Sequence, residues 1–505
     1  MLVDKVIINP KCDILSIDGL AKELRRMYDS FDSKTTGIHL FGLKYGHQLN
    51  NNNIKEIVTA AGLKESYTQE LNKMTRLYSA IKHNIDGVCF YDDIKSILNP
   101  DVVDKVASKI DLCYLRAMRT KPFLLLAGIS GTGKSRIVKQ MAFDCCPDNM
   151  TLRKDATTPG NYCLIEVKPN WHDSSELIGY ASQIGRPHYE VTPFVRFLAK
   201  AMLYEEQRVP FFVCLDEMNL APVEQYFAEF LSVLESRKVV NGRITSEALI
   251  PAEVFSNAKY ECQLKEDLFG LEVKKVSEGE GQSVFDGELA DDELVVYNKL
   301  KEFGLRIPSN LIVIGTVNMD ETTHQFSRKV IDRAMTIEMN LPEGNPFLDF
   351  FNNERDLEYC DEPLSSELFL PSIVKAADAV KVLAKVNADK TEWLKKEIAS
   401  ILTKLNAVLE NTPFKIAYRV QNELILFFYE LWQENKDARW RAILNESVDQ
   451  ILMMKVLPRI EGDEDLLEKP LANLANFCAL YPKATVKVEE MKNRLDRAHF
   501  TSYWP

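Results

Sequence analysis

Apolar residues at the front of the chain recur at helical spacing. Within residues 1–95, stretches such as LAKELRRMYDSF and IKEIVTAAGL repeat apolar positions on one face, which is typical of amphipathic helices. The run of asparagines at 50–53 favours a turn between them, because Asn side chains compete for backbone hydrogen bonds. The pattern predicts a small, separate N-terminal domain over 1–95, mainly helical or α+β.

The pattern changes after about residue 102. An amphipathic helix is expected up to Arg119, Pro122 ends it, and FLLLAG follows as a short buried strand. Three further apolar runs alternate with helical stretches: YCLIEV at 162–167, FFVCL at 211–215 and LIVIGTV at 311–317. This alternation predicts an α/β domain over 96–345, built on a parallel sheet with crossover helices.

Strand patterns stop after about residue 345. Amphipathic stretches then follow, including KTEWLKKEIASILTKLNAVLE and VQNELILFFYELWQEN, so 346–505 are expected to form an all-helical domain. Residues 263–296 carry ten acidic and three basic residues with several glycines. That composition predicts an acidic, solvated loop inserted before the strand at 311–317.

Composition and charge limit the classes of protein to which the chain can belong. Apolar residues make up 46% and charged residues 27%, and no stretch approaches the ~18 continuous apolar residues of a membrane span. The first residues lack the apolar core of a secretory signal, so the cytoplasm is the expected compartment, without a membrane partner. The net charge of −12 argues against extensive nucleic-acid contact, but residues 1–100 hold thirteen Lys and Arg against twelve Asp and Glu. Any DNA contact is therefore expected at the front of the chain.

The segment 128–135, GISGTGKS, lies between a predicted strand and a predicted helix. Its glycines permit backbone conformations that place N–H groups around a phosphate, and the helix N-terminus adds partial positive charge. Lys134 is expected to reach the β- and γ-phosphates and Ser135 to ligate Mg²⁺. A glycine-rich turn is the structural alternative. The expected nucleotide-binding residues here are Gly128, Ser130, Gly131, Thr132, Gly133, Lys134, Ser135 and Arg136.

Polar residues follow the later strands. Asp216 and Glu217 end FFVCLDE, where Asp216 is expected to hold the magnesium shell and Glu217 to act as general base. Asn318 ends LIVIGTVN and is expected to orient water, although an Asn in that position also caps turns. Arg333 is the predicted arginine finger that completes a neighbouring subunit's site. Arg328 is a competing candidate, and a surface salt bridge is the structural alternative for both.

Six motifs occur together and in order: GISGTGKS, KPNWHDSSELIGY, VCLDEMNLAPVEQYFAEFLSVLE, GTVNMDETTHQFSRKVIDRA, AYRVQNEL and KVLPRIEG. Together they resemble the McrB-like branch of the AAA+ proteins over roughly residues 115–465. The resemblance implies an AAA+ P-loop core with a helical lid, a hexameric ring and hydrolysis of ATP or GTP with Mg²⁺. It further implies a DNA-recognising subunit of a modification-dependent restriction system, which binds DNA, with or without a modified base, and activates a separate McrC-like nuclease subunit.

The resemblance also marks single residues. Trp171, Asp173 and Tyr180 stand at marked positions of the family segment 168–180, and Asn219 matches the Asn that follows the acidic pair. Arg419 stands where a lid arginine touches the nucleotide, with an ordinary surface arginine as an equal alternative.

The sequence departs from the family pattern at a position that bears on the choice between ATP and GTP. GTP-using members carry Met-Asn-x-x-Asp, whereas Asn318 is followed by Met319, Asp320 and Glu321. Asp320 is counted among the expected catalytic residues because a carboxylate remains near that position. The choice between ATP and GTP stays open.

Two further readings remain for the function. The first is a protein-remodelling ATPase of the dynein-related or MoxR-like kind, which the acidic total charge suits. The second is a nucleotide-gated scaffold, which the presence of Glu217, Asn318 and Arg333 disfavours. Within IHLFGLKYGHQL, the aromatic and basic residues would either contact a flipped base or, as the sequence favours, place their rings in a small core. These residues are His39, Phe41, Lys44, Tyr45 and His47.

Overall fold

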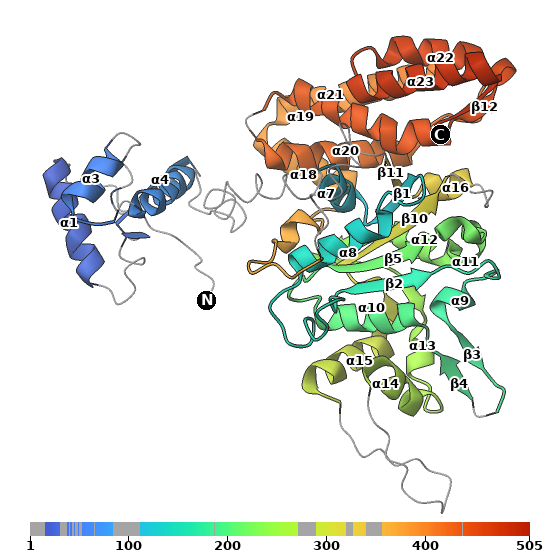
Figure 1. The fold of residues 1–505 in the computed structure, drawn as a ribbon, viewed down its shortest axis with the longest axis horizontal. Helices are drawn as coiled ribbons and strands as arrows, with labels where there is room; N and C mark the ends of the chain where they lie inside the picture. Colours follow the sequence, from blue (N-terminus) through green and yellow to red (C-terminus); the bar gives the residue numbers. More distant parts are fainter. Residues whose placement is uncertain are drawn as a thin grey trace, which may run out of the picture. The chain divides into compact units, whose positions relative to one another are not determined.

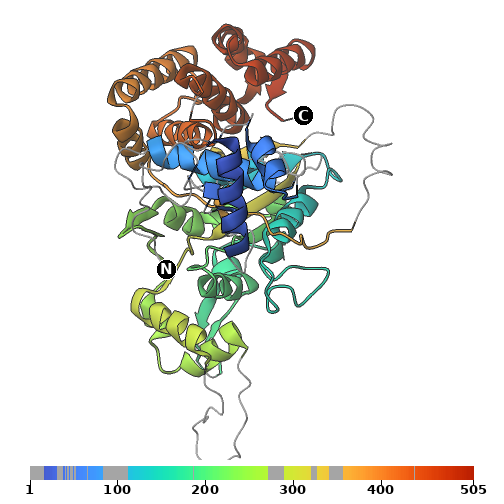
Figure 2. The same cartoon turned by 90° about the vertical axis from the view of Figure 1, so that its left-hand side faces the viewer.

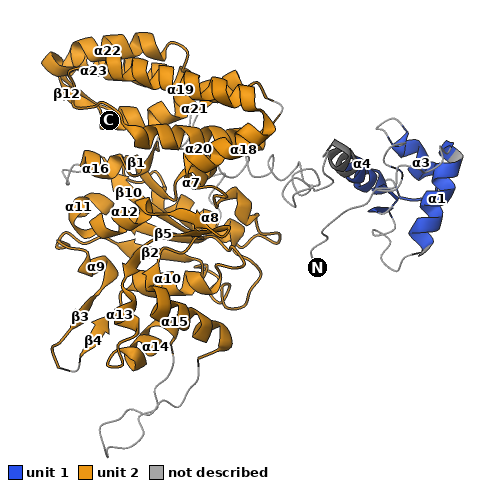
Figure 3. Cartoon of the chain, turned by 180° about the vertical axis from the view of Figure 1, so that it is seen from behind, with its two compact units in different colours: residues 1–111 blue, residues 112–505 orange. Residues whose placement is uncertain are grey.

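The chain forms two compact units, residues 1–111 and 112–505 (Figure 3). The computed structural model describes residues 16–30, 38–39, 41–42, 45, 49, 53–64, 66–83, 112–185, 187–270, 289–319, 327–339, 356–436 and 438–504. Asp320, Lys44 and His47 lie outside these residues, as do 271–288 of the acidic insertion.

The described part of unit 1 is helical. It contains α1 (Ile17–Ser30), α3 (Ile54–Ala60) and α4 (Tyr67–His83). Their apolar faces enclose a small core that includes Leu24, Ile57 and the side chain of Phe41, each fully buried. The rings of Phe41 and Tyr45 lie 4.9 Å apart inside this core. The interpretation of these aromatics as core residues is therefore confirmed, and neither is exposed to a base.

Unit 2 is built around a five-stranded parallel sheet in the order β11-β1-β10-β5-β2 (Figure 1). The strands are β1 (Phe123–Gly128), β2 (Tyr162–Glu166), β5 (Phe211–Asp216), β10 (Leu311–Asn318) and β11 (Met335–Glu338). Every residue of β1 and β10 is buried, as expected for strands covered on both faces. The α/β class and the parallel sheet are thus confirmed.

Helices and short ribbons surround the sheet. Among them, α8 packs against β5 and β10, and α10 packs against β2. The helices are α7 (Leu112–Thr120), α8 (Lys134–Cys145), α9 (Ser175–Ile178), α10 (Pro193–Leu203), α11 (Val223–Tyr226), α12 (Ala228–Glu235), α13 (Ala252–Phe255) and α16 (Arg328–Ile331). The two-stranded ribbons pair β3 (Tyr180–Ser182) with β4 (His188–Glu190), β6 (Lys238–Val240) with β7 (Arg243–Thr245), and β8 (Ala248–Ile250) with β9 (Leu305–Arg306).

The acidic segment 263–296 is not simply a solvated loop. Its ends belong to two helices, α14 (Glu261–Phe269) and α15 (Asp291–Phe303). Leu264 and Val296 are buried in the core of unit 2, so the two helices pack on the domain. The loop prediction is wrong for these ends because the acidic residues occupy only their outer faces.

The C-terminal part is helical with one exception. Its helices are α18 (Ala376–Val386), α19 (Ala388–Val408), α20 (Tyr418–Glu434), α21 (Trp440–Ile451), α22 (Glu464–Cys478) and α23 (Pro482–Ala498). The expectation of an all-helical region misses the short ribbon β12 (Glu461–Asp463) with β13 (Phe500–Ser502). Figures 1 and 2 show these helices at one end of unit 2 and α14 and α15 at the other. Among the described residues, no helix has the length and apolar character needed to cross a membrane.

Candidate active site

The carboxyl ends of β1, β10 and β5 meet at one edge of the sheet. Gly128, the last residue of β1, pairs with Asn318, the last residue of β10, and β10 pairs in turn with β5. The chain leaves β1 toward the β2 edge and leaves β10 toward the β11 edge. Since crossovers are right-handed, these connections depart on opposite faces, and open α/β sheets bind ligands at such a point.

The loop 129–133 joins β1 to α8 at this edge. Gly131 and Gly133 both have φ of 81°, a left-handed conformation that side chains disfavour. A Cβ atom at either glycine would meet no atom within 4 Å, so the loop backbone faces open space there. A left-handed backbone ahead of a helix N-terminus is suited to binding an anion.

Gly128 has a different reason to be glycine. Its φ does not lie in the left-handed region, but a Cβ there would come within 2.3 Å of the Met339 carbonyl oxygen. The close approach of the segment after β11 therefore excludes a side chain. The expectation that Gly128 supplies an unusual dihedral to the loop is wrong.

Lys134 begins α8 and is folded beneath the loop. Its Nζ donates to the carbonyl oxygens of Gly128 at 3.1 Å and Ile129 at 2.8 Å, and the residue is 6% exposed. Thr132 Oγ1 also donates to Ile129 O, at 3.0 Å. Lys134 therefore places its charge against the loop, while Ser130 and Arg136 are exposed around it.

The two residues expected to ligate Mg²⁺ are in direct contact. Ser135 Oγ donates to Asp216 Oδ1 at 2.5 Å, which joins the start of α8 to the end of β5. Thr316 Oγ1 donates to the same carboxylate oxygen at 2.6 Å. The described residues contain no group of three or more His, Cys, Asp or Glu that could hold a metal. An ion here would need substrate and water oxygens as well, which is how Mg²⁺ commonly binds beside phosphates.

Glu217 follows Asp216 in a left-handed conformation, with φ 51° and ψ 49°. This conformation is uncommon for a residue with a side chain, and such residues occur often at functional sites. Glu217 Oε1 accepts a hydrogen bond from Asn318 Nδ2 at 3.0 Å, and the Glu217 N–H donates to Thr316 Oγ1 at 3.0 Å. Asn219 Nδ2 donates to the Asn318 carbonyl oxygen at 3.2 Å. Glu217 is thus oriented from two sides.

Thr316 is the residue that sequence reasoning missed. Its hydroxyl contacts both members of the acidic pair, and the residue is only 2% exposed. Residues two apart in a strand point to the same face, so Thr316 lies on the same face as Asn318. A hydroxyl two residues before Asn318, in an otherwise apolar strand, was the available signal.

Cys214 lies within the strand that carries Asp216. Burial, followed by the negative charge of Asp216, raises the pKa of its thiol far above the ordinary value. The thiolate is the reactive form of cysteine, so this thiol is not a nucleophile.

Arg333 does not lie at this edge of the sheet. It precedes β11, whose first residue Met335 pairs with Leu124 near the start of β1. The amino end of β1 is therefore its neighbour, about 13 Å along the strand from Gly128 at ~3.3 Å per residue. Among the described residues, no hydrogen bond or ion pair of its guanidinium is seen. Arg328 instead stacks on the Phe414 ring, 4.7 Å from its centre.

Arg419, in the first turn of α20, belongs to the same end of the sheet as Arg333. It forms ion pairs with Asp332 and, at 3.4 Å, with Glu235. It is therefore not among the residues that meet at the loop 129–133.

The residues of the family segment 168–180 have separate environments. Trp171 is buried edge-on against Tyr226, and Asp173 accepts the Ser175 N–H at 2.8 Å. Tyr180 is 52% exposed. None of these three contacts the loop 129–133 through an interaction described in the structure.

Comparisons with known proteins cover two parts of the chain. Residues 16–84 match the family of HTH-like domains. Residues 373–500 match a domain family of unknown function, DUF8727. Each match covers less than half of the chain, so neither assigns a family to the whole. Comparison with curated proteins found no match.

Proposed function

We propose that this chain is a nucleoside triphosphatase of the AAA+ type, from the McrB-like branch, that hydrolyses ATP or GTP. The observation that carries the proposal is the meeting of three elements at one sheet edge. These are the loop before α8 with its two glycines in the left-handed conformation, the Ser135–Asp216 contact and the Asn318–Glu217 contact. Phosphate binding, magnesium binding and water activation each require one of them.

In this proposal each part of the hydrolysis reaction is assigned to particular residues of the chain. Backbone N–H groups of the loop and the amino end of α8 bind the phosphates, and Lys134 adds a positive charge. Ser135 and Asp216 would hold Mg²⁺, which would neutralise charge on the phosphate oxygens. Glu217 accepts a proton from the attacking water, and Asn318 orients the Glu217 carboxylate.

Arg333 completes the site of a neighbouring copy in this proposal. Its place at the amino end of the sheet supports this, because it lies far from the loop of its own chain. Its side chain is half-buried, and its exposed part would meet a phosphate on another subunit. The assembly is then a homo-oligomeric ring, hexameric by resemblance.

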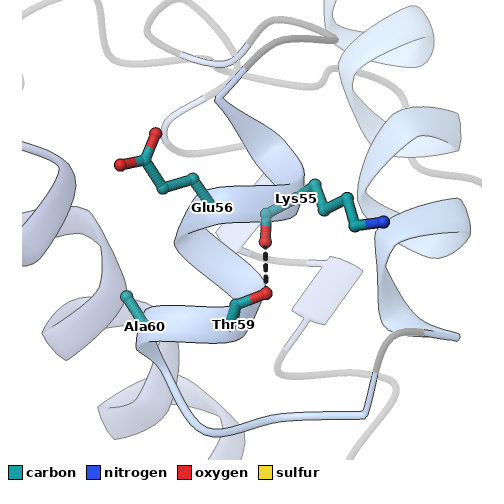
Figure 4. A pocket seen from close by; sticks show the side chains of 4 residues that line it. All are labelled: Lys55, Glu56, Thr59 and Ala60. Atoms are coloured by element: carbon teal, nitrogen blue, oxygen red, sulfur yellow. Dashed lines mark hydrogen bonds between the residues drawn. The ribbon is translucent and has the colours of Figure 1, made fainter.

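Unit 1 is the DNA-recognising part in this proposal. The HTH-like match over 16–84 supports it, and this segment holds ten Lys and Arg against seven Asp and Glu. In helix-turn-helix proteins the second helix of the motif enters the major groove. The exposed face of α3 forms a shallow pocket lined by Lys55, Glu56, Thr59 and Ala60 (Figure 4). That face would contact DNA, with or without a modified base, and a separate McrC-like nuclease would cut it.

Hydrolysis of ATP and of GTP, measured side by side with and without modified and unmodified DNA, tests the proposal. We expect one nucleotide to be hydrolysed in a Mg²⁺-dependent reaction that DNA stimulates, and Lys134→Ala to lose nucleotide binding. Lys139→Ala, on the same helix, is the control. Hydrolysis without any response to DNA would favour the protein-remodelling alternative. Absence of nucleotide binding would refute the proposal as a whole.

A further inference from the structure

A buried lysine from the C-terminal helices contacts the segment that carries Arg333. Lys455 is 0% exposed and lies in a single π-helical turn, Leu452–Val456, that follows α21. Its Nζ donates to the carbonyl oxygens of Asp332 at 2.7 Å, Ala334 at 2.7 Å and Ile331 at 3.4 Å. An ammonium group has three protons, and the two shortest of these contacts, to Asp332 and Ala334 on either side of Arg333, take two of them.

The charge of Lys455 is compensated within the protein. Glu423 Oε2 lies 3.0 Å from Nζ, and the other oxygen of that carboxylate pairs with Lys121 at 2.9 Å. Glu423 is itself only 2% exposed. Burying such charges is costly, and apolar residues of similar volume often stabilise a fold at least as well. Stability alone therefore does not explain this lysine.

The segment that Lys455 contacts follows a helix of only one turn. The helix α16 spans only Arg328–Ile331, and the last carbonyl groups of a helix have no partner within it. Lys455 contacts the last of these carbonyl groups, that of Ile331, which also accepts the Ala334 N–H at 3.3 Å. Two further cations from the C-terminal part, Arg419 and Arg459, contact the Asp332 carboxylate, the latter at 3.4 Å. Residues 331–334 are thus held by the C-terminal part in addition to α16, to which the N–H groups of 332–334 donate.

We propose that Lys455 is a positioning residue for Arg333. By fixing the backbone on both sides of Arg333, it sets where the guanidinium projects and couples that position to the C-terminal helices. The inference rests on the proposed function, because it concerns a cation that acts on a neighbouring subunit's substrate. Rarely occurring π turns are frequent at functional sites, which agrees with this role for 452–456.

The first test compares two buried lysines that contact residues at opposite ends of β11. Lys455→Met removes the donor to the Arg333 segment. Lys487→Met is the matched control, because Lys487 is also buried and pairs with Glu338, at the other end of the strand, at 2.8 Å. We expect Lys455→Met to lower kcat on the order of 100-fold, the cost of misplacing a reacting group by about 1 Å, with nucleotide affinity unchanged. An equal loss in both variants, or none in Lys455→Met, would overturn the inference.

The second test mixes inactive variants in equal amounts. Lys134→Ala has an intact Arg333. Lys455→Met has an intact phosphate-binding loop 129–133 with Lys134, here called the cradle, so a random mixture forms about a quarter of its interfaces from two sound halves. We expect activity to return in that mixture. We expect none from Lys455→Met with Arg333→Ala, since neither supplies a placed arginine. The reverse result would mean that Lys455 serves its own cradle, and the inference would be wrong.

Two controls keep the outcomes separate. If Lys134→Ala and Arg333→Ala also fail to complement each other, the shared-site proposal itself fails, whatever Lys455 does. If Lys455→Met does not fold, Lys455→Gln replaces it, because an amide keeps hydrogen-bond donors and loses only the charge and some length. Lys455→Gln is expected to show the same complementation with a smaller loss of kcat, and full wild-type activity in both Lys455 variants contradicts the inference.

Discussion

Asn318 Nδ2 donates to Glu217 Oε1 at 3.0 Å, across the carboxyl ends of two neighbouring strands. Glu217 has a left-handed backbone, so its side chain leaves β5 in a direction that an extended strand would not give. The hydrogen bond then selects one orientation of the carboxylate. The backbone at the end of β5 therefore sets the position of the expected general base, and Asn318 at the end of β10 sets its orientation.

This relationship predicts different losses for the two residues. Glu217→Gln keeps the shape of the side chain and removes the base, so we expect hydrolysis to fall by about 100-fold or more with nucleotide affinity retained. Asn318→Ala leaves the base present but unoriented and is expected to cost less. Single-turnover hydrolysis beside equilibrium nucleotide binding measures both effects. Equal rates in wild type and Glu217→Gln would remove Glu217 from the mechanism.

Thr316→Val is expected to affect stability and turnover together. The change removes a donor to Asp216 and leaves the partly buried Glu217 N–H without its acceptor, which together cost about 1 kcal/mol or more. Thr336→Val is the matched control, because Thr336 is equally buried in β11 and its hydroxyl has no hydrogen-bond partner within the described part of the chain. Urea unfolding and steady-state hydrolysis check the pair. Similar unfolding free energies for both variants would contradict the assigned contacts.

Arg333→Ala and Arg328→Ala separate the two candidate fingers. Arg333→Ala should bind nucleotide normally but lose the hydrolysis that rises with protein concentration, because its guanidinium acts on a neighbour. Arg328→Ala removes a stack on Phe414 and should change the rate only slightly. Hydrolysis across a range of protein concentrations provides the measurement. A larger loss in Arg328→Ala would exchange the two assignments.

Lys455 should make stability depend on pH. Burial lowers its pKa from 10.5 to about 8, against the opposing effect of Glu423, with Lys121 lowering it further and Asp332 raising it. Between these two values the unfolded lysine keeps a proton that the folded one has released, so unfolding takes up a proton. The unfolding free energy contributed by this group therefore rises with pH across that window.

Denaturant unfolding of wild type and Lys455→Met at about pH 7 and about pH 9.5 checks this sign, since other titrating groups are common to both chains. We expect the stability of wild type relative to the variant to increase at the higher pH. A difference that stays constant would mean that Lys455 keeps its proton throughout.

The sequence indicated the candidate residues at the ends of strands and helices better than the residues that hold them in place. Ser135, Asp216, Glu217 and Asn318 were found because each ends or begins an element, and the ends of parallel strands meet. Thr316 was missed because a single hydroxyl in an apolar strand resembles an ordinary core position. Lys455 and the place of Arg419 were missed because their shared partner, Asp332, lies more than eighty residues away in sequence.

The same contrast applies to the fold. Apolar runs predicted the sheet strands, since burial on both faces leaves little ambiguity. Charge misled the prediction at the two ends of 263–296, where a few inward residues such as Leu264 and Val296 outweigh several acidic ones. The ribbon at 461–463 and 500–502 gave no pattern because each strand has only three residues.

The positions of the cradle and Arg333 at opposite ends of the strands restrict how copies can associate. A contact between unlike ends is heterologous and repeats head to tail, so it continues as an open row or closes on itself. An open row always leaves one loop without an arginine and one arginine without a loop. Closure removes both vacancies at once, which would make the complete ring the most active form per subunit.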